Sequence, residues 1–195
     1  MARSGGRTGG GLEGDCPARV WYPKRMTIQV GDTFPDATLS ETVEFGDACP
    51  LAPKSFRAAE ALADKKVVIF GLPGAYTPTC SAQHVPGYVA HLEALKAKGV
   101  DEVWCVAVND AFVMAAWGRE LGAIGKVRML GDGSAELTKK LGLELDLTGG
   151  GMGVRSQRYA MLVDRGVVRA LHVEQPRKFE VSNAETMLAT LASLG

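Results

Sequence analysis

Short apolar runs alternate with longer segments of helical period along most of the chain, and this alternation predicts an α/β fold. The runs at 67–71 (VVIFG) and 103–108 (VWCVAV) are continuously apolar. Continuous runs are typical of strands that helices cover on both faces. Between them, residues 85–98 have helical period, and Gly99 stands where such a helix would stop. The two apolar runs and the helical segment between them therefore predict a βαβ unit.

The second half of the chain continues the pattern. The predicted elements are a helix capped by Asp110 and running to about Leu121, a strand at 127–130 and a short helix at 134–141.

The last third of the chain predicts a hairpin and a final helix. Residues 158–164 and 167–173 are joined through Arg165 and Gly166, which suit a tight hairpin turn. Residues 182–185 (SNAE) have the Ser-x-x-Glu spacing of a capping box, which predicts a helix from there to about Leu194.

Composition limits the classes of protein to consider. The chain has 195 residues, of which 46% are apolar, enough for one well-packed domain. Lysines and arginines number 22, as do aspartates and glutamates, so no net field favours nucleic acid or an acidic membrane surface. No run approaches the ~20 apolar residues that a membrane-spanning helix needs. We expect a protein that binds neither nucleic acid nor membranes.

Residues 1–25 differ from the rest. They contain six glycines and five basic residues against two acidic ones, with almost no apolar periodicity. This composition predicts a flexible extension, followed by one domain over residues 26–195. The extension lacks the apolar centre of a secretory signal. We expect a cytoplasmic protein, or a mitochondrial or plastid one if residues 1–25 are the remnant of a transit peptide.

Four cysteines stand at positions 16, 49, 80 and 105, without a Cys-x-x-Cys pair. This spacing does not indicate a disulfide framework and favours a reducing compartment. Cys80 is the notable one, because it follows the turn-forming sequence PGAYTPT at the start of a predicted helix. Cys16 and Cys49 have no chemical neighbourhood that the sequence reveals.

A nucleophilic cysteine needs help from its surroundings, since an ordinary thiol has a pKa of about 8.5. Thr77 or Thr79 can cap the helix and bring Cys80 close to its positive end. Lowering a thiol pKa by ~2.5 units takes about 3.4 kcal/mol, whereas a helix terminus supplies roughly 0.3 to 2. We therefore expect one fixed cation beside Cys80 and a hydroxyl donated by Thr77 to the sulfur or to a substrate oxygen. The alternative is a small buried thiol without chemistry.

The spacing Pro73-x-x-x-Thr77-x-x-Cys80, within FGLPGAYTPTCSAQHVPGY, resembles the signature of peroxiredoxins of the type II or PrxV-like subfamily. The resemblance runs from TIQVGD to the C-terminus, about 170 residues, and includes WCVAVNDAFVM and GMGVRSQRYAM. It implies a thioredoxin-like fold with a central mixed β-sheet flanked by helices. It also implies that Cys80 is the peroxidatic cysteine, Thr77 its hydroxyl partner and Arg158 the cation of the site.

The resemblance implies a thiol peroxidase that reduces hydrogen peroxide and alkyl hydroperoxides. The Cys80 sulfur would become a sulfenic acid, which glutathione with glutaredoxin, or thioredoxin, would reduce. An alternative function for the same cysteine is a peroxide sensor whose oxidation signals to a partner. A homodimer is also expected, with residues 73–79 and 110–121 as candidate contacts.

For the second half of the redox cycle, the sequence offers two candidate residues. Many relatives have a resolving cysteine near the last helix, but Ser182 occupies the matching position, where an N-cap already accounts for it. Cys105 matches a cysteine that plant members are thought to use for resolution, yet it lies in an apolar run that favours burial. We therefore expect a one-cysteine cycle, with Cys105 as the alternative resolving residue.

The resemblance places Pro73, Gly74, His84 and Arg155 around the substrate pocket. His84 either lines the site or merely packs, and no third residue that would orient it for a Cys–His hydrolase is evident. Arg155 either supports the site arginine or binds a surface carboxylate. The glycine-rich run 149–153 follows no clear strand, so it is interpreted as a flexible segment rather than a dinucleotide loop. Histidine and cysteine spacing predicts no metal, and no organic cofactor is expected.

Overall fold

The computed structural model describes residue 1 and residues 27–47 and 50–195. The predicted boundary at residue 26 and the cysteines at 16 and 49 lie outside these ranges.

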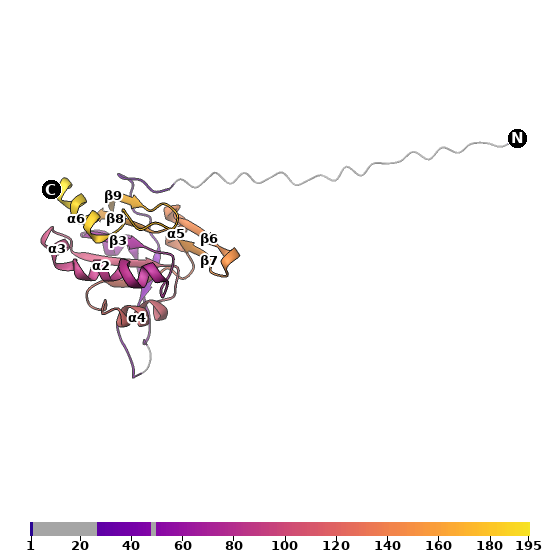
Figure 1. The fold of residues 1–195 in the computed structure, drawn as a ribbon, viewed down its shortest axis with the longest axis horizontal. Coiled ribbons are helices and arrows are strands. Elements are labelled where there is room, and N and C mark those ends of the chain that lie inside the picture. Colours follow the sequence, from indigo (N-terminus) through magenta and orange to yellow (C-terminus); the bar gives the residue numbers. More distant parts are fainter. Residues whose placement is uncertain (2–26, 48–49) are drawn as a thin grey trace.

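A seven-stranded mixed sheet forms the centre of the molecule, in the order β2-β1-β5-β4-β3-β8-β9 (Figure 1). Its strands are β1 (Thr38–Glu41), β2 (Lys54–Arg57), β3 (Lys66–Gly71), β4 (Glu102–Ala107), β5 (Arg128–Gly131), β8 (Tyr159–Asp164) and β9 (Val167–Val173). The three central strands β3, β4 and β5 are parallel, and the pairs outside them are antiparallel. This mixed sheet is the architecture that the resemblance implies.

Helices cover both faces of the sheet. They are α1 (Ala58–Leu62), α2 (Val85–Ala90), α3 (Leu92–Ala97), α4 (Ala111–Glu120), α5 (Glu136–Leu141) and α6 (Ala184–Leu194). Apolar side chains of α2, α3, α4 and α6 share one core cluster, whereas those of α1 and α5 belong to the other. Among the described residues no helix is both long and apolar enough to cross a membrane.

The central strands are continuously apolar because successive side chains enter different cores. Val68 and Phe70 of β3 belong to the cluster under α2, while Val67 and Ile69 belong to the cluster under α1. Each of the four side chains is fully buried. Burial of a large apolar side chain stabilises the fold by roughly 1.5 to 3 kcal/mol, so both faces of β3 hold the helices in place.

Several predicted elements are confirmed. Asp110 caps α4 by accepting a hydrogen bond from the Val113 backbone N–H at 3.0 Å. The hairpin of β8 and β9 turns through Arg165 (φ 48°) and Gly166 (φ 76°), two left-handed residues as the predicted turn requires. The strands at 67–71, 103–108 and 127–130 correspond to β3, β4 and β5 within one residue at each end.

Other predicted elements need correction. The helix over 85–98 is two helices, α2 and α3, separated at His91, and a π-helical turn over Cys80–His84 precedes them. The predicted helix over 134–141 begins at Glu136, because Ala135 adopts a left-handed conformation (φ 55°) that a helix cannot include.

The capping box at 182–185 is wrong. Asn183 is the cap of α6, and its side chain accepts the Thr186 N–H at 2.8 Å. Ser182 instead donates its hydroxyl to Glu174 Oε1 at 2.9 Å. The Ser-x-x-Glu spacing was misleading because Asn183, an equally good cap, stands one residue later.

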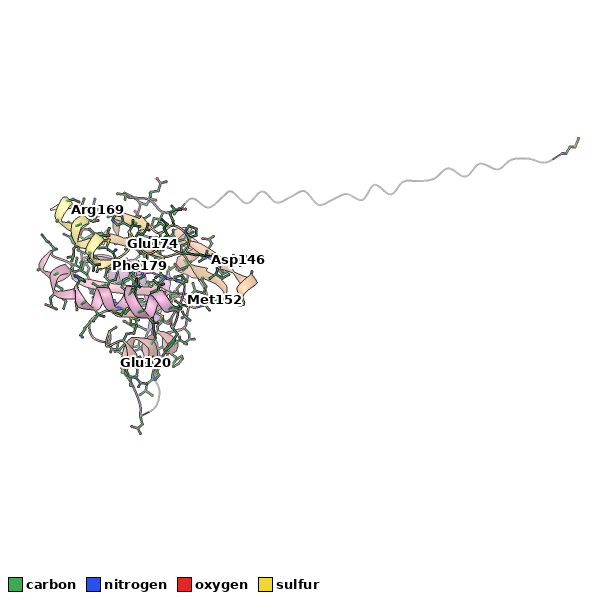
Figure 2. All side chains as sticks on the ribbon, in the orientation of Figure 1. Glu120, Asp146, Met152, Arg169, Glu174 and Phe179 are labelled. Atoms are coloured by element: carbon green, nitrogen blue, oxygen red, sulfur yellow. The ribbon has the colours of Figure 1, made fainter. Side chains whose placement is uncertain are left out.

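The run 149–153 connects the two strands of a second, smaller sheet, and its last residue, Gly153, begins the second strand. Strands β6 (Glu144–Leu147) and β7 (Gly153–Ser156) pair in antiparallel fashion, with a short 3-10 turn over Thr148–Gly150 between them. This hairpin projects from the main sheet in Figure 1 and presents Met152 and Asp146 towards its tip in Figure 2.

Candidate active site

The loop after β3 is held in place by three hydrogen bonds. The Ala75 N–H donates to Asn109 Oδ1 at 3.0 Å, and the Thr77 hydroxyl donates to the Gly74 carbonyl at 2.8 Å. The Thr77 carbonyl in turn accepts the Ser81 N–H at 3.0 Å. The loop therefore enters the first helical turn in one fixed direction.

The predicted roles of the two threonines differ from what the structure shows. Neither Thr77 nor Thr79 makes a side-chain cap to the turn that contains Cys80. The hydroxyl proton of Thr77 is directed at Gly74 rather than at the sulfur, so the lone pairs of this hydroxyl remain as acceptors. A hydroxyl in this state can accept a hydrogen bond from a bound O–H group.

The first turn after the loop places Cys80 and His84 inside the molecule. It is π-helical, and both side chains are fully buried in the core under α2. Single π-helical turns are rare and occur frequently at functional sites, since they change which side chains face one direction. The Cys80 sulfur is thus shielded from bulk water.

Arg158 reaches this turn from the residue just before β8, the strand that pairs with β3. The Tyr159 residue of β8 pairs with Gly71 of β3, and a Cβ atom at Gly71 would lie 2.1 Å from the Tyr159 ring. Only glycine permits this close approach, which puts Arg158 beside the loop that follows β3. The Arg158 Nη2 atom donates to Cys80 Sγ at 3.4 Å.

His84 holds the other arm of the guanidinium. Arg158 Nη1 lies 2.9 Å from His84 Nδ1, and a guanidinium has only donors, so Nδ1 accepts. His84 therefore carries its proton on Nε2, which donates to the Ser182 carbonyl at 3.0 Å. Phe179 packs against both residues, with its ring centroid 5.6 Å from the guanidinium carbon and 4.9 Å from the imidazole. His84 thus lines the site and is oriented there.

His84 remains neutral at ordinary pH. Burial is the main cause, and the adjacent Arg158 charge adds to it, so the pKa of His84 falls to about 3. The Ser182 carbonyl opposes this shift but does not overcome it. A neutral imidazole adds no charge of its own, so its effect on the sulfur acts through the arginine that it holds.

The buried His84 predicts a pH dependence of stability. The unfolded chain binds a proton on this histidine below pH ~6.5, and the folded one only near 3, so stability rises with pH between these values. We expect the contribution of His84 to fall by about 2 kcal/mol between pH 7.5 and pH 5. In urea unfolding, the His84→Gln variant should lack this component. Parallel curves of unfolding free energy against pH for the two proteins would contradict it.

Cys105 lies on β4 in the same buried cluster as Cys80. It pairs with Phe70 of β3, and both cysteines are free thiols. Burial, and secondarily the neighbouring Cys80, raises the pKa of Cys105 well above its usual range. The Cys105 thiol is therefore a poor nucleophile in this conformation.

Arg155 contacts the site in a way that neither predicted alternative describes. Its guanidinium donates to the carbonyls of Met152 (2.7 Å) and Val108 (3.1 Å). A Cβ atom at Gly74 would lie 3.0 Å from Arg155 Nη1, so Gly74 leaves room for this arginine. Arg155 thereby connects the β6–β7 hairpin to the residue after β4 and lies close to the loop after β3.

A cavity of about 510 Å³ adjoins the arginine. It is lined by Pro73, Thr79, Leu145, Leu147, Gln157, Arg158, Glu174, Gln175, Pro176, Arg177 and Lys178. Leucine and proline side chains form its apolar part, while Arg158 marks the end that approaches Cys80. Such a cavity suits a small organic group attached to a polar reacting atom.

The sequence pattern did not reveal four residues that shape the site: Asn109, Tyr88, Phe179 and Glu174. Asn109 fixes the loop, and the Tyr88 hydroxyl donates to the Ser182 carbonyl at 2.9 Å beside His84. Only Asn109 had a signal, since it directly follows the apolar run at 103–108.

The described residues contain no group of three or more histidine, cysteine, aspartate or glutamate side chains placed to hold a metal ion.

A family model described as Redoxin matches residues 29–188. Peroxiredoxin-2E, chloroplastic, of Arabidopsis thaliana is 47% identical over 171 residues, which cover 87% of this chain and 71% of that relative. The chain belongs to the peroxiredoxin family. Among its members it is a type II peroxiredoxin, and it is accordingly a thiol peroxidase.

Solved structures agree with this peroxiredoxin assignment. Reduced Prx3 of Vibrio vulnificus in complex with hydrogen peroxide is 52% identical with a TM-score of 0.77, covering 85% of this chain and 99% of that one. A protein of Burkholderia cenocepacia described as a putative thioredoxin reductase is 60% identical with a TM-score of 0.80, covering 85% and 98%. That description applies to the Burkholderia protein, whereas the family of this chain follows from the Redoxin match and its peroxiredoxin relatives.

Proposed function

We propose that this peroxiredoxin reduces peroxides through Cys80 as the nucleophile, with Arg158 as the fixed cation of the site. The observation that carries the proposal is the Arg158 Nη2 atom at 3.4 Å from Cys80 Sγ, held there by His84. A guanidinium so close to the sulfur is placed to stabilise negative charge that develops on a reacting oxygen beside it. The thiolate is the reactive species.

The reaction is a displacement at oxygen. The Cys80 thiolate donates an electron pair to one peroxide oxygen, the O–O bond breaks, and the second oxygen leaves as hydroxide or alkoxide and takes up a proton. Arg158 stabilises the negative charge that develops on the departing oxygen. Thr77, whose hydroxyl lone pairs are free to accept, orients the O–H of the attacked oxygen. The product is an alcohol or water, with a sulfenic acid on Cys80.

The cavity beside Arg158 supports organic hydroperoxides as substrates in addition to hydrogen peroxide. Its volume of about 510 Å³ exceeds what hydrogen peroxide needs, and Leu145, Leu147, Pro73 and Pro176 give it an apolar wall. An alkyl group would lie against this wall while the peroxide group meets Arg158. Small alkyl hydroperoxides fit this arrangement.

An external thiol completes the proposed cycle. Ser182 offers no resolving sulfur, and Cys105 is fully buried with a raised pKa, which disfavours its attack on the sulfenic acid. Glutathione with glutaredoxin, or thioredoxin, would reduce Cys80 directly. A reducing compartment suits this chemistry: the cytoplasm, or an organelle if residues 1–25 are a transit remnant, as the chloroplastic name of one relative suggests.

Intact mass spectrometry after one equivalent of hydrogen peroxide tests the one-cysteine cycle. We expect a gain of one oxygen in the wild-type protein and in Cys105→Ala. The mass should return to its starting value on addition of glutathione and glutaredoxin, or of thioredoxin with its reductase. A loss of two hydrogens that disappears in Cys105→Ala would show an internal disulfide and contradict this cycle.

A homodimer through the loop after β3 and α4 is part of the proposal. Tyr76 and Phe112 are 53% and 48% exposed, large apolar groups on these two elements. The Tyr76 backbone has a φ of 60°, a costly conformation for a non-glycine residue. Sedimentation velocity should show a dimer for the wild type and a monomer for Tyr76→Ser with Phe112→Ser. A specific dimer should be well populated at ~50 µM, so a wild-type monomer at that concentration would contradict the proposal.

A further inference from the structure

One carboxylate organises the loop between β9 and α6. Glu174 Oε1 accepts the backbone N–H groups of Glu180 (2.7 Å), Val181 (2.8 Å) and Ser182 (2.8 Å) and the Ser182 hydroxyl (2.9 Å). Burial opposes ionisation of Glu174, but these donors outweigh it and hold the pKa of the carboxyl below its usual range. Figure 2 labels Glu174 and Phe179 in this loop. An ionised carboxylate with four donors fixes the backbone around it firmly.

The fixed loop continues into the active site. The Ser182 carbonyl accepts His84 Nε2–H at 3.0 Å, and His84 Nδ1 accepts Arg158 Nη1–H at 2.9 Å. Arg158 Nη2 then donates to Cys80 Sγ at 3.4 Å. The backbone N–H of Glu174 also donates to the Arg158 carbonyl at 2.9 Å. Glu174 is thus connected to the backbone of Arg158 directly. It is connected to the guanidinium through Ser182 and His84.

We propose that Glu174 is a positioning residue for the reaction at Cys80. Its carboxylate fixes Ser182, whose carbonyl holds the His84 ring in the orientation that keeps the Arg158 guanidinium on the sulfur. This inference rests on the proposed roles of Cys80 and Arg158. It adds Glu174, which lines the cavity beside Arg158 but makes no hydrogen bond to the Cys80 sulfur.

The need for such a device follows from the arginine side chain. A free arginine samples many rotamers, which amounts to about 2 kcal/mol of side-chain entropy. Without the Ser182 carbonyl, His84 Nε2–H loses its acceptor, and the orientation that presents Nδ1 to the Nη1 arm of Arg158 loses a support. A displacement of about 1 Å at a reacting group can reduce a rate by as much as 100-fold. Rigid support of the guanidinium therefore contributes to the rate rather than only to stability.

The experiment measures the second-order rate constant for Cys80 oxidation by hydrogen peroxide, in stopped flow at 25 °C, on protein shown to be folded by circular dichroism. Glu174→Gln retains the size of the side chain but removes its charge, and we expect a roughly tenfold lower rate constant, as for loss of a hydrogen bond to a charged group. Glu174→Asp keeps the charge on a shorter side chain and should lose less. Thr190→Val is the matched control, because it removes a hydrogen bond between α6 and His172 of β9 that lies outside this series of contacts (2.9 Å).

A double-mutant cycle separates positioning from a purely structural role. In an Arg158→Ala background, Glu174→Gln should change the rate constant less than twofold, because no guanidinium remains to be positioned. An equal tenfold loss in both backgrounds, or a Glu174→Gln rate equal to that of the wild type, would overturn the inference while leaving the peroxidase proposal intact. Failure of the proposed function would show differently, as wild-type protein that is not oxidised at Cys80.

Discussion

Replacement of Cys80 by serine is expected to reduce peroxide turnover to the rate of the reductant alone. A serine hydroxyl remains protonated near neutral pH and is a poor nucleophile towards an O–O bond, even beside the Arg158 guanidinium. The assay follows the consumption of hydrogen peroxide with dithiothreitol as the reductant. The peroxide that remains at each time is quantified by its oxidation of ferrous iron. The substitution exchanges one small buried side chain for another. We therefore expect the variant to fold.

Cys105→Ala is the matched control, since it removes the other described thiol in the same core. We expect this variant to retain turnover within a factor of about two to three, with some loss of stability from the cavity that it leaves. Turnover that survives in Cys80→Ser would contradict the assignment of the chemistry to Cys80. Turnover that is lost in Cys105→Ala, while the protein stays folded, would contradict it as well.

Replacement of Arg158 by alanine should have the next largest effect. Both arms of this guanidinium are used, one on His84 at 2.9 Å and one on Cys80 at 3.4 Å. Removal of one preorganised donor from a site of developing negative charge costs roughly 100- to 1,000-fold in rate. We expect a loss of that size in the rate constant for hydrogen peroxide. Arg158→Lys should be intermediate, because an ammonium provides the charge without the two-armed geometry.

Arg169→Ala controls for the loss of a positive charge. Arg169 is an exposed arginine on β9 and is labelled in Figure 2. Its removal should leave the rate constant unchanged within a factor of about two, because exposed charges are screened by salt and solvent. Equal losses in Arg158→Ala and Arg169→Ala would mean that net charge, and not the geometry at Cys80, sets the rate.

The elements that the sequence predicted well have local causes. The strands β3 and β4 are apolar on both faces, and the cap of α4 is a single aspartate three residues before its donor. The turn between β8 and β9 needs two left-handed residues and has glycine as one of them. Each of these signals is contained within a few consecutive residues, so it could be recognised without the rest of the fold.

The strands that were missed have no such local signal. β2 (KSFR) has three exposed side chains and one half-buried one, and β6 (ELDL) alternates exposed and half-buried positions over only four residues. These strands exist because of their partners, β1 and β7, rather than through their own burial. Edge strands of this length carry too few apolar positions for a period to be detected.

The site was predictable in part for the same reason. The sequence around Cys80 singled out this cysteine as the candidate nucleophile, and the resemblance supplied Arg158, which the structure places beside it. The direction of the Thr77 hydroxyl depends on the carbonyl of Gly74, and the role of Ser182 depends on Glu174, eight residues earlier along the chain. Contacts of this kind follow from the folded backbone, which no spacing in the sequence specifies.

The central claim is that the environment of Cys80 is built for peroxides and does more than make the thiol reactive. The most direct test is the ratio of two rate constants for wild-type Cys80, one with hydrogen peroxide and one with iodoacetamide. We expect this ratio to exceed that of free cysteine by at least ~1,000-fold, because Arg158 and Thr77 are placed for the breaking O–O bond and not for alkylation. A ratio equal to that of free cysteine would contradict the account.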